Sequence, residues 1–196
     1  MLNLFDNYEL QREELLARIA QELELDQTRK ERMDKAYKKV LEVLRKDEVF
    51  FKEYELELYA QGSVRISTTV KPINRADFDL DTVLHIYDLH KKFDPTKIYN
   101  ALVRVLEADT YYESILEKKD RCVRLNFKGD FHIDILPGCM IELDDRNRIA
   151  IPEKKLNSWS SGNPRGFGDW FLTIADSHQS FMLETFARTL IKAEVE

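Results

Sequence analysis

Residues 77–86 read DFDLDTVLHI, a run that alternates carboxylates with apolar side chains and then becomes mainly apolar. Alternation with a period of two is typical of a β-strand, whose successive side chains point to opposite faces of the sheet. Asp77, Asp79 and Asp81 would then share one face, while the apolar residues between them point into a core. Three carboxylates on one face of a partly buried strand repel one another and resist loss of water. The run therefore predicts that a cation compensates them, and no Lys or Arg alternates with them to do so.

A second source of carboxylate lies in residues 131–137, FHIDILP, where Asp134 stands between two isoleucines. This run also has strand character, and a neighbouring strand could bring Asp134 beside the first group. Two divalent ions about 4 Å apart, bridged by carboxylates, form the clamp with which many enzymes transfer phosphoryl groups. Hard oxygen ligands favour Mg²⁺ or Mn²⁺. The sequence thus predicts a site for two such ions between Asp134 and the carboxylates of the first run.

The dipeptide Gly62-Ser63 follows a predicted strand that begins near Tyr54 and alternates apolar and polar residues. A glycine lets the backbone approach a phosphate closely, and a serine hydroxyl and backbone N–H groups can bind phosphate oxygens. Neither Gly-Ser nor a single Asp-x-Asp carries much weight alone, because both are common in turns. Their order carries more: a strand, Gly-Ser, a strand that opens with Asp-x-Asp, and a later strand with one Asp.

Helices are predicted around these strands, which indicates an α+β fold. Helical spacing of apolar residues covers the first fifty residues, with Asp26 as the cap of a second helix that runs through Val49. Asp94 and the proline after it have the residue types that begin a helix, here through Ala108.

The second half of the sequence predicts two more strands and a closing helix. Residues 121–127 and 131–137 indicate a hairpin across a Lys-Gly-Asp turn. Residues 154–166 read as a loop, and residues 167–195 have the apolar spacing of a helix. No cap residue ends this last helix, so we expect either that its continuation is missing from the sequence or that its natural end is frayed.

Taken in chain order, five residues resemble the signature of the polymerase β-type nucleotidyltransferases: Gly62, Ser63, Asp79, Asp81 and Asp134. The longer runs QGSVRISTTVKPINRADFDLDTVLHI (61–86) and WSSGNPRGFGDWF (159–171) resemble the bacterial cyclic-oligonucleotide synthases related to cyclic GMP-AMP synthase, the CD-NTases of anti-phage signalling. The resemblance covers residues 55–172.

This resemblance implies a polymerase β-like nucleotidyltransferase palm, a mixed sheet with flanking helices. To it are added N-terminal helices and the start of a C-terminal helical lobe that completes the nucleotide pocket in the family. We therefore expect residues 1–152 to form the palm with its N-terminal helices. Residues 153–196 would be a linker and the beginning of the lobe.

The resemblance also implies a role for each residue of the signature. The metal ligands would be Asp79, Asp81 and Asp134, with Asp134 also assisting the 3′-hydroxyl nucleophile. Gly62 and Ser63 would hold the donor triphosphate. A register shifted by two residues would instead make Asp77 and Asp79 the ligand pair; the apolar run directly after Asp81 favours the first assignment.

The implied function is a magnesium- or manganese-dependent synthase that joins nucleoside triphosphates into a cyclic di- or trinucleotide second messenger and releases pyrophosphate. Two alternatives stay open. One is a nucleotidyltransferase that modifies a protein or an RNA. The other is a non-catalytic nucleotide-binding palm domain.

The composition of the chain limits the kinds of molecule that it is expected to bind. The chain has 196 residues and a formal net charge of -6, so its surface as a whole repels polyanions. Double-stranded nucleic acid is therefore not expected as an activator, and a regulatory protein partner is left unidentified. The sequence predicts no membrane span and no signal peptide, which favours a cytoplasmic protein.

Some polar residues near the signature receive other interpretations. His85 and His132 are expected to be structural and to lie on a different face from the carboxylates. Arg65, Lys71 and Arg75 follow the Gly-Ser turn and would either reach phosphates or be solvated charges.

Overall fold

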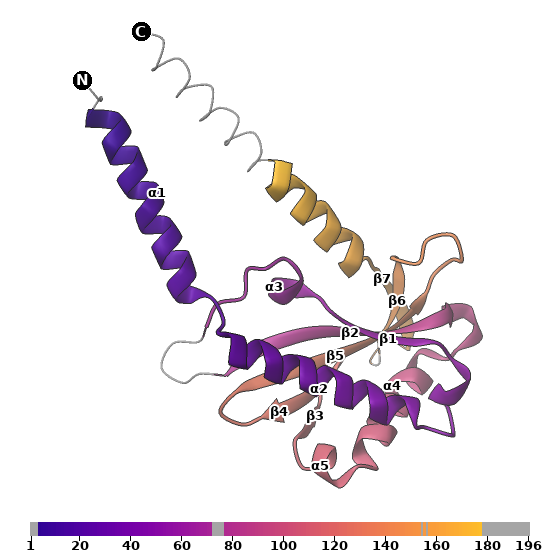
Figure 1. Ribbon diagram of the computed structural model, residues 1–196. Coiled ribbons are helices and arrows are strands. Elements are labelled where there is room, and N and C mark those ends of the chain that lie inside the picture. The colour runs from indigo at the N-terminus through magenta and orange to yellow at the C-terminus, as the bar shows by residue number, and fades with distance from the viewer. Residues whose placement is uncertain (1–3, 72–76, 154, 156, 178–196) are drawn as a thin grey trace.

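The computed structural model describes residues 4–71, 77–153, 155 and 157–177 (Figure 1). The helices are α1 (Leu4–Leu23), α2 (Gln27–Arg45), α3 (Gly62–Arg65), α4 (Pro95–Glu107) and α5 (Thr110–Glu113), with a further helix over residues 164–177. The strands are β1 (Leu56–Ala60), β2 (Phe78–Leu89), β3 (Leu116–Lys118), β4 (Val123–Phe127), β5 (Phe131–Met140), β6 (Ile149–Glu153) and β7 (Ser158–Gly162). The predicted α+β class is confirmed.

All these strands belong to one mixed, seven-stranded sheet with the order β1-β2-β5-β4-β3. The central pair, β2 and β5, is parallel, and the other pairs are antiparallel. The predicted hairpin between β4 and β5 is confirmed, with Gly129 at φ +76° in its turn. Strand β6 pairs only with the end of β5, at Cys139 and Met140, and carries β7 on its other edge.

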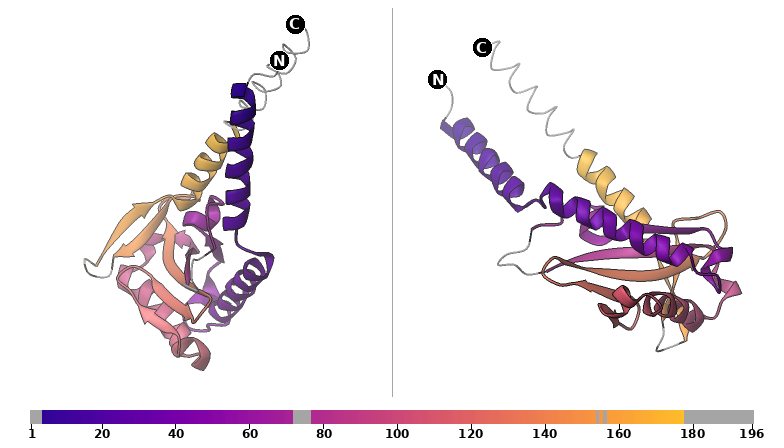
Figure 2. Two further views of the ribbon diagram at one scale, coloured as in Figure 1. Left: turned by 90° about the vertical axis from the view of Figure 1, so that its left-hand side faces the viewer. Right: turned by 60° about the horizontal axis from the view of Figure 1, so that its bottom comes forward.

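Helices α2 and α4 cover one face of this sheet (Figures 1 and 2). The even-numbered residues of β2 point to that face, and Leu80, Leu84 and Ile86 are fully buried there against side chains of both helices. Burial of this apolar area is the main stabilising contribution of the fold. The odd-numbered residues of β2 consequently point to the opposite face.

Residues Asp26 and Asp94 cap their helices as predicted. The Asp26 carboxylate accepts a hydrogen bond from the Arg29 backbone N–H at 2.9 Å, and that of Asp94 accepts one from the Thr96 backbone N–H at 2.9 Å. Helix α2 ends at Arg45 rather than at the predicted Val49.

The predicted loop over residues 154–166 is partly wrong. Within it, residues 158–162 form β7, which pairs with β6 from Ile149 to Glu153. The final helix begins at residue 164, before the predicted 167, because Pro164 suits the first turn and Asn163 accepts a hydrogen bond from the Gly166 backbone N–H at 2.8 Å. Residues 178–195 of the predicted helix lie outside the described residues. The domain boundary at residue 152 stays a prediction.

Helix α1 and the helix over residues 164–177 both extend away from the sheet in the same general direction (Figures 1 and 2). Among the helices of the described ranges, none is long and apolar enough to cross a membrane.

Candidate active site

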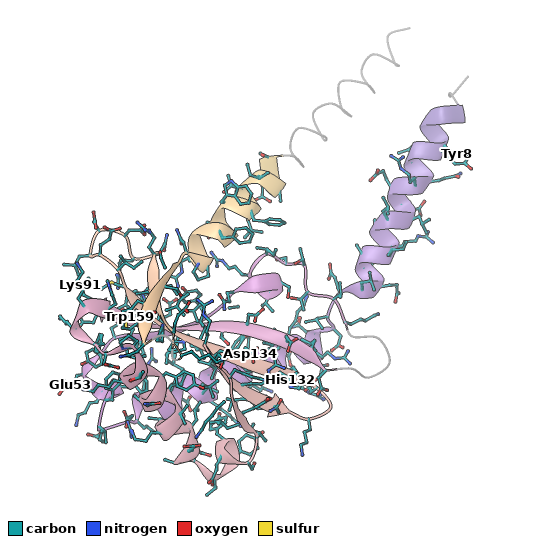
Figure 3. All side chains as sticks on the ribbon, turned by 180° about the vertical axis from the view of Figure 1, so that it is seen from behind. Tyr8, Glu53, Lys91, His132, Asp134 and Trp159 are labelled. Carbon is teal, nitrogen blue, oxygen red and sulfur yellow. The ribbon has the colours of Figure 1, made fainter. Side chains whose placement is uncertain are left out.

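The parallel pairing of β2 and β5 brings the predicted carboxylates together. Asp81 lies directly opposite Asp134, and Asp79 lies opposite His132. All four side chains therefore share the face of the sheet that α2 and α4 leave uncovered, and Figure 3, seen from the side opposite to Figure 1, shows Asp134 and His132 next to each other there. Asp77 precedes β2, and its Oδ2 atom lies 3.5 Å from His132 Nε2. This register favours Asp79 and Asp81 over the alternative pair.

The carboxylate of Asp81 is partly buried. Burial raises its pKa, and the negative charges of Asp134 and Asp79 raise it further, against a smaller opposite effect of Arg124. A carboxyl group that is disfavoured in its charged form by two neighbouring carboxylates is one that a bound cation would stabilise.

The sequence interpretation missed Arg124, which supplies a positive charge to the cluster. It lies on β4 directly opposite Asp134, and its Nε and Nη2 atoms each donate a hydrogen bond of 2.7 Å to the Asp134 carboxylate. Its Nη2 also lies 3.2 Å from Asp79 Oδ1. The hydrogen bond to Asp134 is the main reason that the pKa of Arg124 is raised, and the guanidinium stays charged. The sequence did contain a signal for this role, because Arg124 stands between the apolar residues Val123 and Leu125 of a predicted strand.

The Gly62-Ser63 turn adjoins these carboxylates. Gly62 has φ +59°, a left-handed conformation that favours glycine, and a Cβ atom placed there would lie 2.6 Å from Asp81 Oδ2. The Gln61 backbone N–H donates to the Asp81 carbonyl at 2.8 Å, and Ser63 Oγ accepts a hydrogen bond from Thr69 Oγ1 at 2.9 Å. The turn that was predicted to hold a triphosphate is therefore in direct contact with a predicted metal ligand.

Comparison with known proteins gives the family of the chain. Residues 11–174 match the family described as the Second Messenger Oligonucleotide or Dinucleotide Synthetase domain, SMODS. The chain belongs to the SMODS family. The resemblance inferred from the sequence is thereby confirmed at the level of the family.

Relatives of this SMODS chain include a protein named c-di-GMP synthase from Roseivirga ehrenbergii, 42% identical over 189 residues. That match covers 96% of the chain and 50% of the relative, so the chain spans about half the length of the curated relative.

Similar solved structures share the fold. The CD-NTase CdnG of Bradyrhizobium diazoefficiens, in complex with GTP, has a TM-score of 0.67 at 22% identity, over 81% of this chain and 45% of that one. The 3′-deoxy GTP-bound DncV of Escherichia coli has a TM-score of 0.60 at 16% identity, over 76% of this chain and 57% of that one.

The residues of the candidate site fit Mg²⁺ or Mn²⁺ by two observations. The donors are carboxylate oxygens, and a cationic side chain already bridges Asp79 and Asp134. As these side chains stand, however, no three His, Cys, Asp or Glu residues in the described part of the chain converge closely enough to hold an ion. Since Arg124 hydrogen-bonds both oxygens of Asp134, an ion bound by all three carboxylates would either share these oxygens with the guanidinium or displace it.

A groove elsewhere in the SMODS domain has no part in this site. It has a volume of about 500 Å³ and lies on the helical side of the sheet, between α2 and the aromatic residues Tyr111 and Phe127. None of the predicted carboxylates lines it.

The expectation that His85 and His132 avoid the carboxylate face is wrong. Residues an even number of positions apart on a strand share a face, so His132 lies beside Asp134, and His85 lies further along the face of Asp81. His85 is fully buried, and neither of its ring nitrogens has a hydrogen-bond partner among the described residues. Burial, together with the charge of Arg165, lowers its pKa to about 4, so the ring is neutral.

Two basic residues after the Gly-Ser turn, Arg65 and Lys71, pair with carboxylates of other helices. Arg65 Nη2 donates to Asp169 Oδ1 in the helix over residues 164–177. Lys71 Nζ lies 3.3 Å from Glu22 Oε2. Arg75 lies outside the described residues.

Proposed function

We propose that this chain is the catalytic palm of a nucleotidyltransferase that joins nucleoside triphosphates into a cyclic dinucleotide and releases pyrophosphate. The observation that carries the proposal is the pairing of Asp81 with Asp134 across the two parallel strands, with Asp79 on the same face and Gly62 against Asp81. Membership of the SMODS family supports it.

The reaction requires two phosphoryl transfers. In each, a 3′-hydroxyl oxygen forms a bond to the α-phosphorus of a triphosphate, the bond from that phosphorus to the bridging oxygen breaks, and pyrophosphate leaves. The Asp134 carboxylate, which accepts two hydrogen bonds from Arg124, would receive the hydroxyl proton. Two Mg²⁺ or Mn²⁺ ions, held by Asp79, Asp81 and Asp134, would supply the charge that activates the hydroxyl and neutralises the leaving pyrophosphate.

The substrate we propose is GTP, with c-di-GMP as the product. Its support is the name of the Roseivirga ehrenbergii relative, which is 42% identical over nearly the whole chain. A cyclic trinucleotide, which the sequence left open, is the second candidate, because the family description covers oligonucleotides as well as dinucleotides. Gly62 and Ser63 would hold the triphosphate of the donor.

The test is incubation of the protein, in its full natural length, with radiolabelled GTP or ATP and Mg²⁺ or Mn²⁺, followed by phosphatase treatment and separation. We expect a phosphatase-resistant product from GTP that Asp79→Asn and Asp81→Asn each abolish. Asp77→Asn is the matched variant, because Asp77 lies outside β2 and should leave the product in place. Loss of product with Asp77→Asn and not with Asp81→Asn would show that the alternative ligand pair is correct.

One observation favours a non-catalytic palm as the second candidate. Arg124 takes both oxygens of Asp134 and lies near Asp79, so it supplies the compensating charge without any ion. If no product forms, and nucleotide binding does not depend on Mg²⁺, a non-catalytic nucleotide-binding palm replaces the nucleotidyltransferase as the proposed function. Labelling of an added protein or RNA would instead support macromolecular modification.

The biological role rests on the family resemblance alone. We propose cytoplasmic synthesis of the messenger in bacterial anti-phage signalling. Phage plating on cells that express the natural operon, with wild-type protein or with Asp81→Asn, checks this. Equal plaque numbers on both would contradict the role without affecting the enzymatic proposal.

A further inference from the structure

Arg65 connects the Gly-Ser turn to the helix over residues 164–177. It is the last residue of α3, the single helical turn that Gly62 begins. Its Nη2 donates to Asp169 Oδ1, and its Nε atom is buried without a hydrogen-bond partner in the described part of the chain. The guanidinium is thus directed to a carboxylate of another element.

Gly168 provides an independent sign that this contact is built into the fold. A Cβ atom on Gly168 would lie 2.6 Å from Arg65 Cγ and 2.9 Å from Arg65 Nε. Only a residue without a side chain lets Arg65 lie this close to the helix. Glycine inside a helix costs about 1 kcal/mol relative to alanine, and the close packing of Arg65 is a contact that offsets this cost.

The same helix also contacts the strand that leads into the turn. Arg165 Nη2 lies 2.8 Å from Glu57 Oε1, and its guanidinium carbon lies 4.2 Å from the centre of the Tyr59 ring. Both partners belong to β1, which ends just before Gly62. The helix therefore contacts the strand–turn–helix unit on both sides of the Gly-Ser dipeptide.

The turn has little freedom toward the carboxylates. Gly62 is already in contact with Asp81, and the Thr68 backbone N–H donates to the Ser63 carbonyl at 2.9 Å. A shift of α3 relative to the helix over residues 164–177 would consequently change the distance between Ser63 and the carboxylates. Such small displacements of a positioning group affect substrate binding strongly.

We propose that Arg65 is a positioning residue: by packing on Gly168 and pairing with Asp169, it fixes the Gly62-Ser63 turn against the carboxylates, and it does not bind the triphosphate itself. This inference deepens the proposed function and rests on it for its kinetic test. It also assigns a role to the run 159–171, whose residues the proposed chemistry does not use. That run carries the contacts that attach the C-terminal helix to the turn.

The decisive variant is Asp169→Asn, because the two possible roles of Arg65 predict opposite effects. If Arg65 positions the turn, loss of its partner raises the KM for the triphosphate about tenfold with a smaller change in kcat. Arg65→Gln and the double variant then raise KM as well, because each of them removes the pairing between Arg65 and Asp169. If Arg65 binds phosphate, Asp169→Asn leaves KM unchanged or lowers it, whereas Arg65→Gln raises it, and the proposal is wrong.

A matched control and a second measurement keep this result independent of the enzymatic proposal. Glu142→Gln removes an exposed ion pair of similar kind, with Arg148 at 3.2 Å, and should change nothing. Amide hydrogen exchange without nucleotide reports the turn directly: we expect residues 61–69 to exchange faster in Asp169→Asn and Arg65→Gln than in the wild type. Faster exchange with no product from any protein would contradict the proposed function alone. Unchanged exchange in both variants would overturn the positioning role.

Discussion

Gly62 and Asp81 are in contact: a Cβ atom on Gly62 would lie 2.6 Å from Asp81 Oδ2, and Gly62 itself has φ +59°. The contact joins the predicted phosphate turn to a predicted metal ligand. Its consequence is that the position of the turn and the position of the carboxylate cannot vary independently.

The first prediction concerns Gly62→Ala. A left-handed backbone costs a residue other than glycine about 1 kcal/mol, and the new methyl group must also displace the Asp81 carboxylate. We expect a small loss of thermal stability and a large loss of product formation. Gly129→Ala is the matched control, because Gly129 has φ +76° but nothing within 4 Å of its Cβ position. Equal activity loss in both variants would show that the contact with Asp81 has no role.

The sequence predicted the parts of the site that depend on local pattern. The alternation around Asp79 and Asp81 gives their shared face, because side-chain direction on a strand is set by position alone. The partner of Asp134 could not be predicted in this way. Arg124 reaches it because β4 lies next to β5, and strand order is a property of the whole sheet.

The errors have similar causes. Residues 158–162 read SWSSG and lack alternating apolar residues, yet they form β7, since pairing with β6 satisfies their backbone. The direction of the Arg65 side chain also could not be predicted from local sequence, because its partner Asp169 lies 104 positions away along the chain. His85 and His132 were misplaced although their spacing from the carboxylates contained the answer.

Replacement of Arg124 tests whether a cation site underlies the cluster. In Arg124→Met the partly buried carboxylate of Asp134 loses its partner, which should cost about 2 kcal/mol of unfolding free energy in the absence of metal. Added Mg²⁺ should then raise the melting temperature of this variant more than that of the wild type, because the ion no longer competes with a guanidinium. Arg148→Met, which removes an exposed pair, serves as control. An equal effect of Mg²⁺ on all three proteins would contradict competition at Asp134.

Asp47 connects α2 to the rest of the fold and predicts a loss of stability in acid. Burial raises its pKa, but the Arg104 hydrogen bond and those from the backbone N–H groups of Phe51, Phe50 and Val49 outweigh this effect and lower the pKa to about 2. A lowered carboxyl pKa stabilises the folded state above the unfolded value of about 4, and this stability is lost as pH falls from there toward 2.

The expected contribution of Asp47 is about 2 kcal/mol at neutral pH. Urea denaturation of the wild type and Asp47→Asn should therefore differ by this amount at pH 6 and converge as the pH approaches 2. A difference that stays constant over this range would mean that Asp47 acts through packing rather than through its charge.

His85 predicts a second acid sensitivity, at higher pH. Its pKa is lowered to about 4 by burial and by the charges of Arg165 and Arg146, against an opposite effect of Glu57. A histidine that is neutral in the fold protonates first in the unfolded chain, whose pKa is about 6.5. Its contribution to the unfolding free energy is thus fully present above pH 6.5 and is lost as pH falls toward 4, by about 2 kcal/mol at pH 5.

His85→Phe keeps a ring that can stack on Tyr87, 4.1 Å away between ring centres, and removes two unpaired buried nitrogens. We expect this variant to lose about 2 kcal/mol less than the wild type between pH 7 and pH 5 in urea denaturation. Identical losses in the wild type and His85→Phe would mean that His85 is protonated in the fold, and the Arg165 side chain would then have to lie elsewhere.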